Sequence, residues 1–377
     1  MAVFLQNKPI SLDTLKDLRI RNIRLYRAQT ELKKPISDAT HQLTEISFVI
    51  LRLQLENGVV GESYLLSFQY SPHAIIGAFK DVKEIIHGYK TNETGTVYTK
   101  LESLAEYFGN PGLLRWAQAA VNIAMWDAWG KHLGLPVHEI LGVHREKVSL
   151  YGSGGWISYT LDELIDEVSG YAASGFKAVK IKVGSPKIST DLERLKKVRE
   201  VLGDEIDIMM DANQGMDLPM AIKLAKAARD LNIQWFEEPV HHQNFQAYEI
   251  LKNQTGISLA MGEREFDTLP LRELATRNAL DIWQPDILRI GGVEAWRESA
   301  ALAKSFHLPV LPHYYKNYDV PLLCTISNGI GAESFDWIDP LIDNPMKVEK
   351  GYARPHAQPG WGFNFLDEHL TEIRLDT

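Results

Sequence analysis

The sequence predicts an α/β protein built on a (β/α)8 TIM-type barrel, and three observations support this fold class. From Val148 onward, eight short β-rich runs alternate with amphipathic helical segments, the order expected of a parallel sheet closed into a barrel. The runs end in polar residues at even spacing, and residues 1–140 follow a different pattern. An open doubly wound sheet is the alternative, but no G-x-G-x-x-G or P-loop motif follows any run, so its usual nucleotide sites are absent.

The first 140 residues predict an α+β segment. Residues 18–66 alternate apolar and polar side chains as β-strands do, and the Asn57-Gly58 pair predicts a tight hairpin between two of these strands. A polar stretch, KKPISDATHQLTE, interrupts the strands and predicts an exposed loop. From residue 71 to about 141, apolar residues recur every three or four positions, which predicts helices that end near Gly134 and Pro136.

The barrel strands are predicted from eight runs and from the residues that end them. The runs are VSLYGSGG, AVKIKVG, IDIMMDAN, IQWFEEP, ISLAMGE, LDIWQPD, LPVLPH and IGAES. Seven of them end, at intervals of 20 to 29 residues, in Lys182, Asp211, Glu237, Glu263, Asp286, His313 and Glu333. Because the carboxyl ends of all barrel strands meet at one rim, we expect these seven side chains to converge on a single cavity.

Composition excludes several classes of protein. The 377 residues include 40 Lys and Arg against 49 Asp and Glu, a net charge of −9, which argues against binding to nucleic acid or to an anionic membrane. The single cysteine, Cys324, excludes an intrachain disulfide framework and fits a reducing compartment. No secretory signal is visible at the start, and no apolar run reaches the roughly 18–20 residues that span a bilayer. We therefore expect a cytoplasmic protein.

Three carboxylates at consecutive strand ends predict a metal site. Asp211, Glu237 and Glu263 would offer three oxygens on one side of an octahedron, which suits one Mg²⁺ ion and leaves positions for substrate and water. Without a cation, three clustered carboxylates would repel one another. Glu238 follows Glu237 but points to the other side of the strand, so we assign it to the surroundings rather than to the metal.

Potential acids and bases occupy the neighbouring strand ends. Lys180 and Lys182 share one face of a strand, and each ammonium should lower the pKa of the other toward that of a base. Schiff-base formation or charge balance are alternative roles for this pair. Asp286 is placed to orient His313 for acid–base work, and Glu333 could donate a proton or hydrogen bond to an oxyanion if its pKa is raised.

These motifs together resemble the enolase superfamily, specifically its mandelate racemase subgroup, over nearly the whole chain. The matching segments are VKIKVG, MDAN, FEEP, MGE, QPDILRIGGV, LPH and GAESFDW. A lysine or histidine base beside Mg²⁺ is already established for that superfamily. The resemblance implies Lys182 and the His313–Asp286 pair as bases, Glu333 as an electrophilic residue and Asn213 as a substrate contact. Lys180, beside Lys182, is expected to take part in catalysis and to bind substrate.

The resemblance also implies a domain arrangement. It places an α+β capping domain at 1–140, the barrel at 141–335, and a C-terminal tail at 336–377 that packs back on the capping domain. The loops at 33–45 and 64–70 look like those that select the substrate in this family. Barrels of the family assemble, so we expect a homo-oligomer.

The motifs leave two reactions open, both beginning with removal of the proton α to a carboxylate. A racemase returns the proton to the other face, whereas a dehydratase expels a β-hydroxyl and forms a 2-keto-3-deoxy acid. We favour dehydration of a sugar acid, because the tail FDWIDPLIDN…QPGWGFNF resembles galactarate- and talarate-type dehydratases. The expected pocket is also polar, with Arg264, Tyr314, Tyr315 and Lys316 beside the rim, of which we assign Arg264 and Tyr315 to substrate.

Two alternatives remain beside this reading. The segment from Tyr314 to Lys316 could simply start the following helix instead of facing substrate. A sugar-acid-binding protein without catalysis is the alternative from another functional class.

Overall fold

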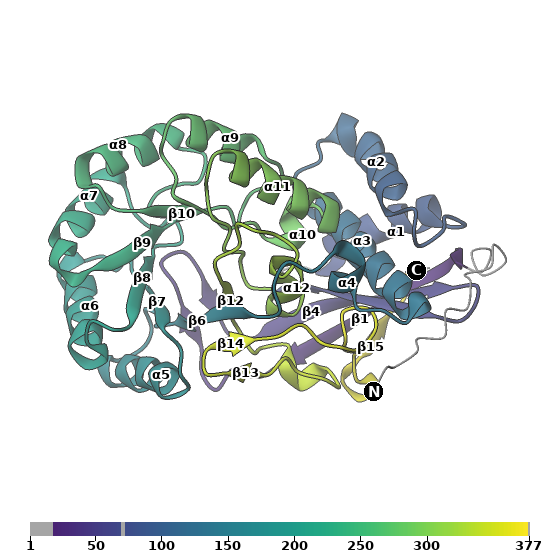
Figure 1. The fold of residues 1–377 in the computed structure, drawn as a ribbon, viewed down its shortest axis with the longest axis horizontal. Coiled ribbons are helices and arrows are strands. Elements are labelled where there is room, and N and C mark those ends of the chain that lie inside the picture. The colour runs from purple at the N-terminus through teal and green to yellow at the C-terminus, as the bar shows by residue number, and fades with distance from the viewer. Residues whose placement is uncertain (1–17, 69–71, 376–377) are drawn as a thin grey trace, which may run out of the picture.

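The computed structural model describes residues 18–68 and 72–375, which form two connected parts. In Figure 1 a ring of strands and helices, from β6 to β12, lies beside a sheet covered by helices α1 and α3, and α2 packs on α3. We call that sheet with its three helices the cap. No helix in the described ranges is long and apolar enough to cross a membrane.

The cap sheet is antiparallel and has the strand order β15-β1-β4-β5. The hairpin predicted at Asn57-Gly58 is confirmed, because Gln54 pairs with Val60 and Gly58 has a φ of +88°, which favours glycine. The short last strand comes from the tail and pairs with the first strand, Leu25 opposite Ile373. The bounds are β1 Ile20–Thr30, β4 Ile46–Leu55, β5 Val60–Leu66 and β15 Thr371–Ile373.

Helix α3 joins the cap sheet to the rest of the molecule. It is buried over most of its circumference and packs closely on β5, where a Cβ at Gly61 would lie 2.1 Å from the Ala124 carbonyl oxygen. It ends as predicted at Gly134, whose left-handed conformation caps the helix. The helices of this part are α1 Pro72–Ile86, α2 Thr94–Ala105, η2 Glu106–Phe108, α3 Leu113–Leu133 and α4 Val137–Leu141.

The parallel strands run in sequence order, and pairing of β12 with β6 closes the barrel. Its interior is filled by side chains from several strands, among them Tyr151, Met209 and Trp235. The strands are β6 Val148–Gly154, β7 Ala178–Lys182, β8 Asp207–Asp211, β9 Ile233–Glu237, β10 Leu259–Met261, β11 Ile282–Trp283 and β12 Ala332–Ser334.

One of the eight predicted strands is reduced to a single residue. In the run LPVLPH only Val310 pairs with its neighbours, as isolated bridges to Trp283 and Gly329. Pro309 and Pro312 have no N–H to donate to a sheet, so the ladder cannot extend on either side. The expectation of a full strand there is wrong, although the run still occupies its place in the ring.

Helices follow the strands and cover the outside of the barrel (Figure 1). Local signals start several of them: Thr160 and Glu163 form a capping box, and the Asp217 side chain accepts a hydrogen bond from the Met220 N–H. The helices are α5 Leu161–Ala173, α6 Ile188–Leu202, α7 Leu218–Ala227, η3 Arg229–Leu231, α8 Phe245–Thr255, α9 Leu269–Thr276, α10 Ile287–Ile290, α11 Val293–Ser305 and α12 Lys316–Leu323.

The tail connects the barrel back to the cap. Asp127 on α3 accepts hydrogen bonds from the N–H groups of Trp361 and Glu62, both at 2.8 Å, so one buried carboxylate joins tail, helix and sheet. The tail elements are η4 Asp339–Leu341, β13 Val348–Glu349, β14 Tyr352–Ala353 and η5 Asp367–His369. The domain boundaries at 140 and 335 stay predictions.

A small hairpin of the cap reaches the mouth of the barrel. It consists of β2 Ile36–Ser37 and β3 Gln42–Leu43, and in Figure 1 it extends from the cap sheet toward the barrel strands. The Ser37 carbonyl accepts a hydrogen bond from the Ile157 N–H, and the Thr40 hydroxyl donates one to the Asn213 carbonyl. These contacts place the predicted loop 33–45 over the strand ends.

Candidate active site

A cavity of about 390 Å³ lies where the strand ends of the barrel face the cap. Of the predicted strand-end residues, Lys182, Glu263, Asp286, His313 and Glu333 line it directly. We call the charged strand-end residues the floor of this cavity. The sequence therefore predicted the location of the cavity on the rim of the barrel.

The structure brings the three predicted metal-binding carboxylates together. Asp211, Glu237 and Glu263 are each at most 6% exposed, and one oxygen of each lies within 4.8 Å of the others. Burial raises the pKa of Glu237 to about 7 although Lys180 acts against this shift. Buried carboxylates so close together need positive charge, and three oxygen donors on a rigid rim are the donor set of a hard divalent cation. The residues present fit Mg²⁺.

Lys180 supplies part of that positive charge. Its ammonium lies 2.5 Å from Glu237 and 2.8 Å from Glu333, and the side chain is 1% exposed. Burial favours the neutral amine, but the neighbouring carboxylates, Glu237 foremost, hold the Lys180 pKa well above its usual range. Lys180 is therefore a buried cation that joins the second and last of the acidic strand ends.

Lys182 lies one pleat further along the same strand. Its Nζ donates a hydrogen bond of 2.6 Å to Asp211 and lies 5.4 Å from the centre of a Trp156 ring. Burial and Lys180 both lower the Lys182 pKa, but the carboxylates around it, Asp211 foremost, outweigh them and raise it. The expectation of a net lowered lysine pKa is thus wrong for the protein alone, because the sequence did not show how many carboxylates contact the pair.

His313 and Asp286 form the predicted pair. The Nδ1 of His313 lies 3.0 Å from Asp286, and its Nε2 lies 3.5 Å from Glu263. Burial favours the neutral imidazole, but Glu263 and Asp286 together raise the His313 pKa. Asp286 also caps α10, where it accepts the N–H groups of Leu288 and Arg289. One carboxylate therefore orients the imidazole and begins a helix.

Glu333 is held as an acceptor. It accepts the Tyr314 N–H at 2.9 Å, and Lys180 outweighs the effect of burial, so that the Glu333 pKa is lowered to about 2. The raised pKa that a proton donor at this position requires is not found. The other predicted role of Glu333, donation of a hydrogen bond to an oxyanion, also requires a protonated carboxyl group and therefore a raised pKa.

Of the four residues predicted to bind substrate, Lys180 lies below the cavity lining, and the other three line the cavity but differ in availability. The Oδ1 of Asn213 is buried without a hydrogen-bond partner. Arg264 is already paired, at 2.8 Å to Glu238 and 3.3 Å to Glu263, and Glu238 itself stays outside the carboxylate cluster. The hydroxyl of Tyr315 accepts the Leu66 N–H. Asn213 is the one of the three whose polar atom remains unpaired.

Lys316 does not belong to the cavity. It starts α12, is 1% exposed, and is paired with Asp336 and Asp339. The alternative that this segment begins a helix is therefore right for Lys316, and Tyr314 and Tyr315 remain in the cavity lining.

The side of the cavity away from the strand ends is apolar, and we call it the wall. The cap supplies aliphatic side chains together with Phe68 and Trp116. The barrel and the start of the tail supply Leu288, Phe335 and two tryptophans, Trp156 and Trp337, which are stacked with ring centroids 6.0 Å apart. The expectation of a polar pocket is right for the floor and wrong for the wall, since cap and barrel are far apart in sequence. The wall consists of Leu43, Leu65, Leu66, Phe68, Ala74, Ile75, Leu113, Trp116, Trp156, Leu288, Phe335 and Trp337.

Both predicted selector loops contribute to the cavity. Asp38, His41 and Leu43 come from the loop 33–45, and residues 65–68 come from the second loop, of which residues 69 and 70 lie outside the described ranges. Sequence reasoning missed Arg289, which also lines the cavity. Its spacing was a usable signal, because it follows Asp286 by three residues at the start of a helix and so lies on the same side.

The fold and the floor together define a class: a barrel enzyme site with an acidic metal-binding cluster between two potential bases. Family comparison agrees with this class. Residues 163–369 match the enolase C-terminal domain-like family, and residues 20–142 match the mandelate racemase / muconate lactonizing enzyme N-terminal domain. The chain belongs to this enolase-type family.

Individual relatives share less than 30% sequence identity with this chain, but their alignments cover more than 90% of it. The L-talarate/galactarate dehydratase of Salmonella typhimurium is 29% identical over 93% of this chain and 90% of its own length. The D-galactarolactone cycloisomerase of Agrobacterium fabrum is 29% identical over 95% of this chain and 99% of its own. The crystal structure of the Salmonella dehydratase liganded with Mg and L-lyxarohydroxamate has a TM-score of 0.89 at 28% identity, covering 99% and 98% of the two chains.

Proposed function

We propose that this protein is a Mg²⁺-dependent dehydratase that converts a sugar acid of the galactarate or talarate type to a 2-keto-3-deoxy acid. One observation carries the proposal: the cluster of Asp211, Glu237 and Glu263 lies between Lys182 on one side of the strand order and His313 on the other. Similarity to the Salmonella dehydratase, whose structure is liganded with Mg, supports both the metal and the reaction.

The three carboxylates would hold the Mg²⁺ ion. When bound, the ion would stabilise the substrate carboxylate and the additional negative charge that develops on it as the α-proton leaves. Lys180 lies against Glu237 and Glu333, where its fixed charge favours the same developing anion. The floor thus brings fixed positive charge to the place where the anion develops.

The two bases divide the proton transfers. One of Lys182 Nζ and His313 Nε2, in its neutral form, removes the proton from the carbon next to the carboxylate, and the other, in its protonated form, gives a proton to the departing β-hydroxyl, which leaves as water. The carboxylates that raise both pKa values in the protein alone would be neutralised in part by the Mg²⁺ ion that they hold, which favours the neutral form of the base. The resulting enol converts to the 2-keto-3-deoxy acid. Asp286 keeps the Nδ1 of His313 occupied, so that the Nε2 is the nitrogen directed at the carboxylate cluster.

The apolar wall favours a second candidate, racemisation of an α-hydroxy acid with an apolar side chain. The same two bases would serve, one removing the α-proton and the other returning a proton to the opposite face. The substrate rather than the floor would then decide the outcome.

A direct assay separates these functions. The purified protein with Mg²⁺ is mixed with a library of aldarates and aldonates, and formation of 2-keto acid is followed. We expect at least one sugar acid to be converted, and the conversion to stop on chelation. Exchange of an α-proton in D₂O without elimination would instead establish the racemase, and binding without either reaction would establish a non-catalytic sugar-acid-binding protein.

A further inference from the structure

The guanidinium of Arg289 is an unpaired cation in the cavity. Arg289 is half-buried and lines the cavity, yet no described residue forms a hydrogen bond or ion pair with its guanidinium. The other lysine and arginine side chains of the described lining already donate hydrogen bonds to carboxylates, Lys182 to Asp211 and Arg264 to Glu238. Glu263 is close enough for its charge to act on Arg289 but forms no ion pair with it, so an anionic ligand group at hydrogen-bond distance would stabilise the half-buried guanidinium further.

The position of Arg289 is set from two sides. Its backbone N–H donates a 3.0 Å hydrogen bond to Asp286, the same carboxylate that orients His313. Its guanidinium carbon lies 5.4 Å from the centre of a Trp116 ring, within the range of a cation–π interaction. Since Trp116 belongs to α3 of the cap, the guanidinium extends from the floor to the wall.

The surroundings select the kind of ligand group. The Trp116 ring lies beside the guanidinium and offers no acceptor to its N–H groups, which therefore remain available to a ligand. A guanidinium presents parallel N–H groups that match the two oxygens of a carboxylate. A hydroxyl would leave the charge uncompensated.

We propose that Arg289 binds the distal carboxylate of a dicarboxylic sugar acid, and that it thereby selects aldarates over aldonates. The inference rests on the proposed function, because it assumes that the first carboxylate of the same substrate lies at the floor. Trp116 is a positioning residue, because its ring lies 5.4 Å from the guanidinium carbon and keeps the guanidinium beside the wall.

Binding measurements in an inactive background test this proposal without relying on turnover. In Lys182→Ala protein with Mg²⁺, calorimetry compares an aldarate with the aldonate of the same configuration, for example galactarate and galactonate. We expect the diacid to bind more tightly. Adding Arg289→Gln should weaken diacid binding about 10- to 100-fold and leave the monoacid nearly unchanged.

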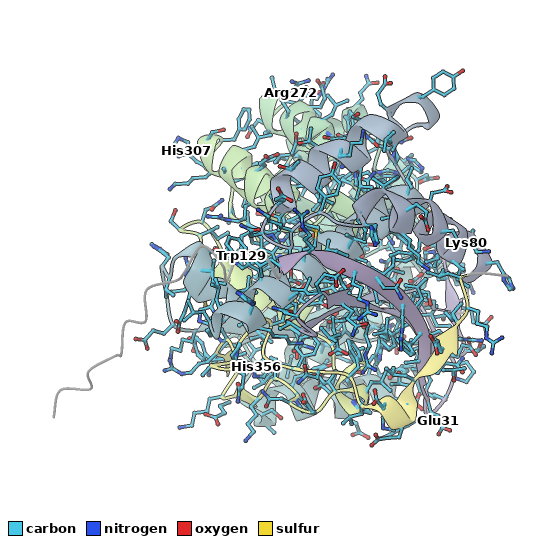
Figure 2. The ribbon with its side chains drawn as sticks, turned by 90° about the vertical axis from the view of Figure 1, so that its right-hand side faces the viewer. Glu31, Lys80, Trp129, Arg272, His307 and His356 are labelled. Atoms are coloured by element: carbon cyan, nitrogen blue, oxygen red, sulfur yellow. The ribbon has the colours of Figure 1, made fainter. Side chains whose placement is uncertain are left out.

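Two further variants serve as controls. Arg289→Lys retains the positive charge but lacks the parallel N–H groups of the guanidinium, and it should recover part of the preference for the diacid. Arg272→Gln removes an exposed arginine from α9, at the outer edge of the molecule in Figure 2, and should change neither affinity.

The outcomes are distinct from those of the activity assay. Equal affinity for the two acids, equal weakening of both by Arg289→Gln, or no binding of any diacid would overturn the role of Arg289. If the diacid binds through Arg289 but the active protein converts no sugar acid, the proposed function fails and the binding role stands.

Discussion

At the floor of the cavity, charged side chains from neighbouring strand ends form ion pairs of 2.5 to 3.6 Å, as in the contacts of Lys180 with Glu237 and Asp211. The wall is different: it consists of aliphatic and aromatic side chains from the cap, the barrel and the tail, and beside its Trp116 lies one cation without an ion pair, Arg289. The floor therefore resembles a fixed reaction centre, and the wall is where different substrates would be distinguished.

This difference reflects how each region is built. Floor residues extend from strands of one closed sheet, whose spacing is set by backbone hydrogen bonds. Wall residues come from six separated stretches of the chain, in the cap, the barrel and the tail, and no single sheet sets their spacing. A substitution in the wall can change its shape without moving the floor, so changes in specificity need not disturb the chemistry.

The largest expected effect comes from removing a base of the floor. Lys182→Ala should lower kcat by about 10²–10⁴-fold, the usual contribution of a positioned base, while the fold is retained. Steady-state kinetics and a thermal melt measure both effects. The matched control is Lys177→Ala, an exposed lysine just before the same strand. A comparable loss in the control variant would mean that the floor is no more sensitive than the outside of the barrel.

Loss of a cluster carboxylate should remove the response to metal. In the unaltered protein, Mg²⁺ at a hundred times its Kd should stabilise the fold by about 2.7 kcal/mol, read as a rise in Tm. Asp211→Asn should abolish this rise, because an amide removes one negative charge from the cluster. Asp207→Asn, at the exposed start of the same strand, should keep it. If Mg²⁺ does not raise the Tm of the unaltered protein, the metal site is refuted.

A substitution in the wall should give the smallest effect, and it should change KM rather than kcat. The centre of a Trp337 ring lies 4.5 Å from that of Phe335 and 6.0 Å from that of Trp156. Trp337→Leu therefore removes aromatic packing from the wall. We expect KM to rise about 2- to 10-fold, the value of one or two aromatic contacts, with kcat nearly unchanged. Trp129→Leu changes a tryptophan outside the cavity lining, labelled in Figure 2, and serves as the control. A fall in kcat as large as that of Lys182→Ala would remove the distinction between wall and floor.

Much of the floor could be predicted because it follows local rules. Strand runs such as IDIMMD and IQWFEE each place a carboxylate at the carboxyl end, and a barrel brings all such ends to one rim. The Asn57-Gly58 hairpin and the end of α3 at Gly134 were predicted for a similar reason, since short backbone preferences determine both. The sequence predicted a full strand around Val310, where the structure has only isolated bridges. Pro309 and Pro312, which lack an N–H, were a local signal against a full strand.

The sequence by itself determined the barrel, the three acidic strand ends and the residues on either side of them, because periodicity and strand spacing are properties of neighbouring residues. Only the tertiary structure decided that Lys182 contacts more negative than positive charge, that Arg264 is already paired, and that Arg289 is not. Those properties depend on which distant side chains come within a few ångströms, and no local pattern in the chain records that.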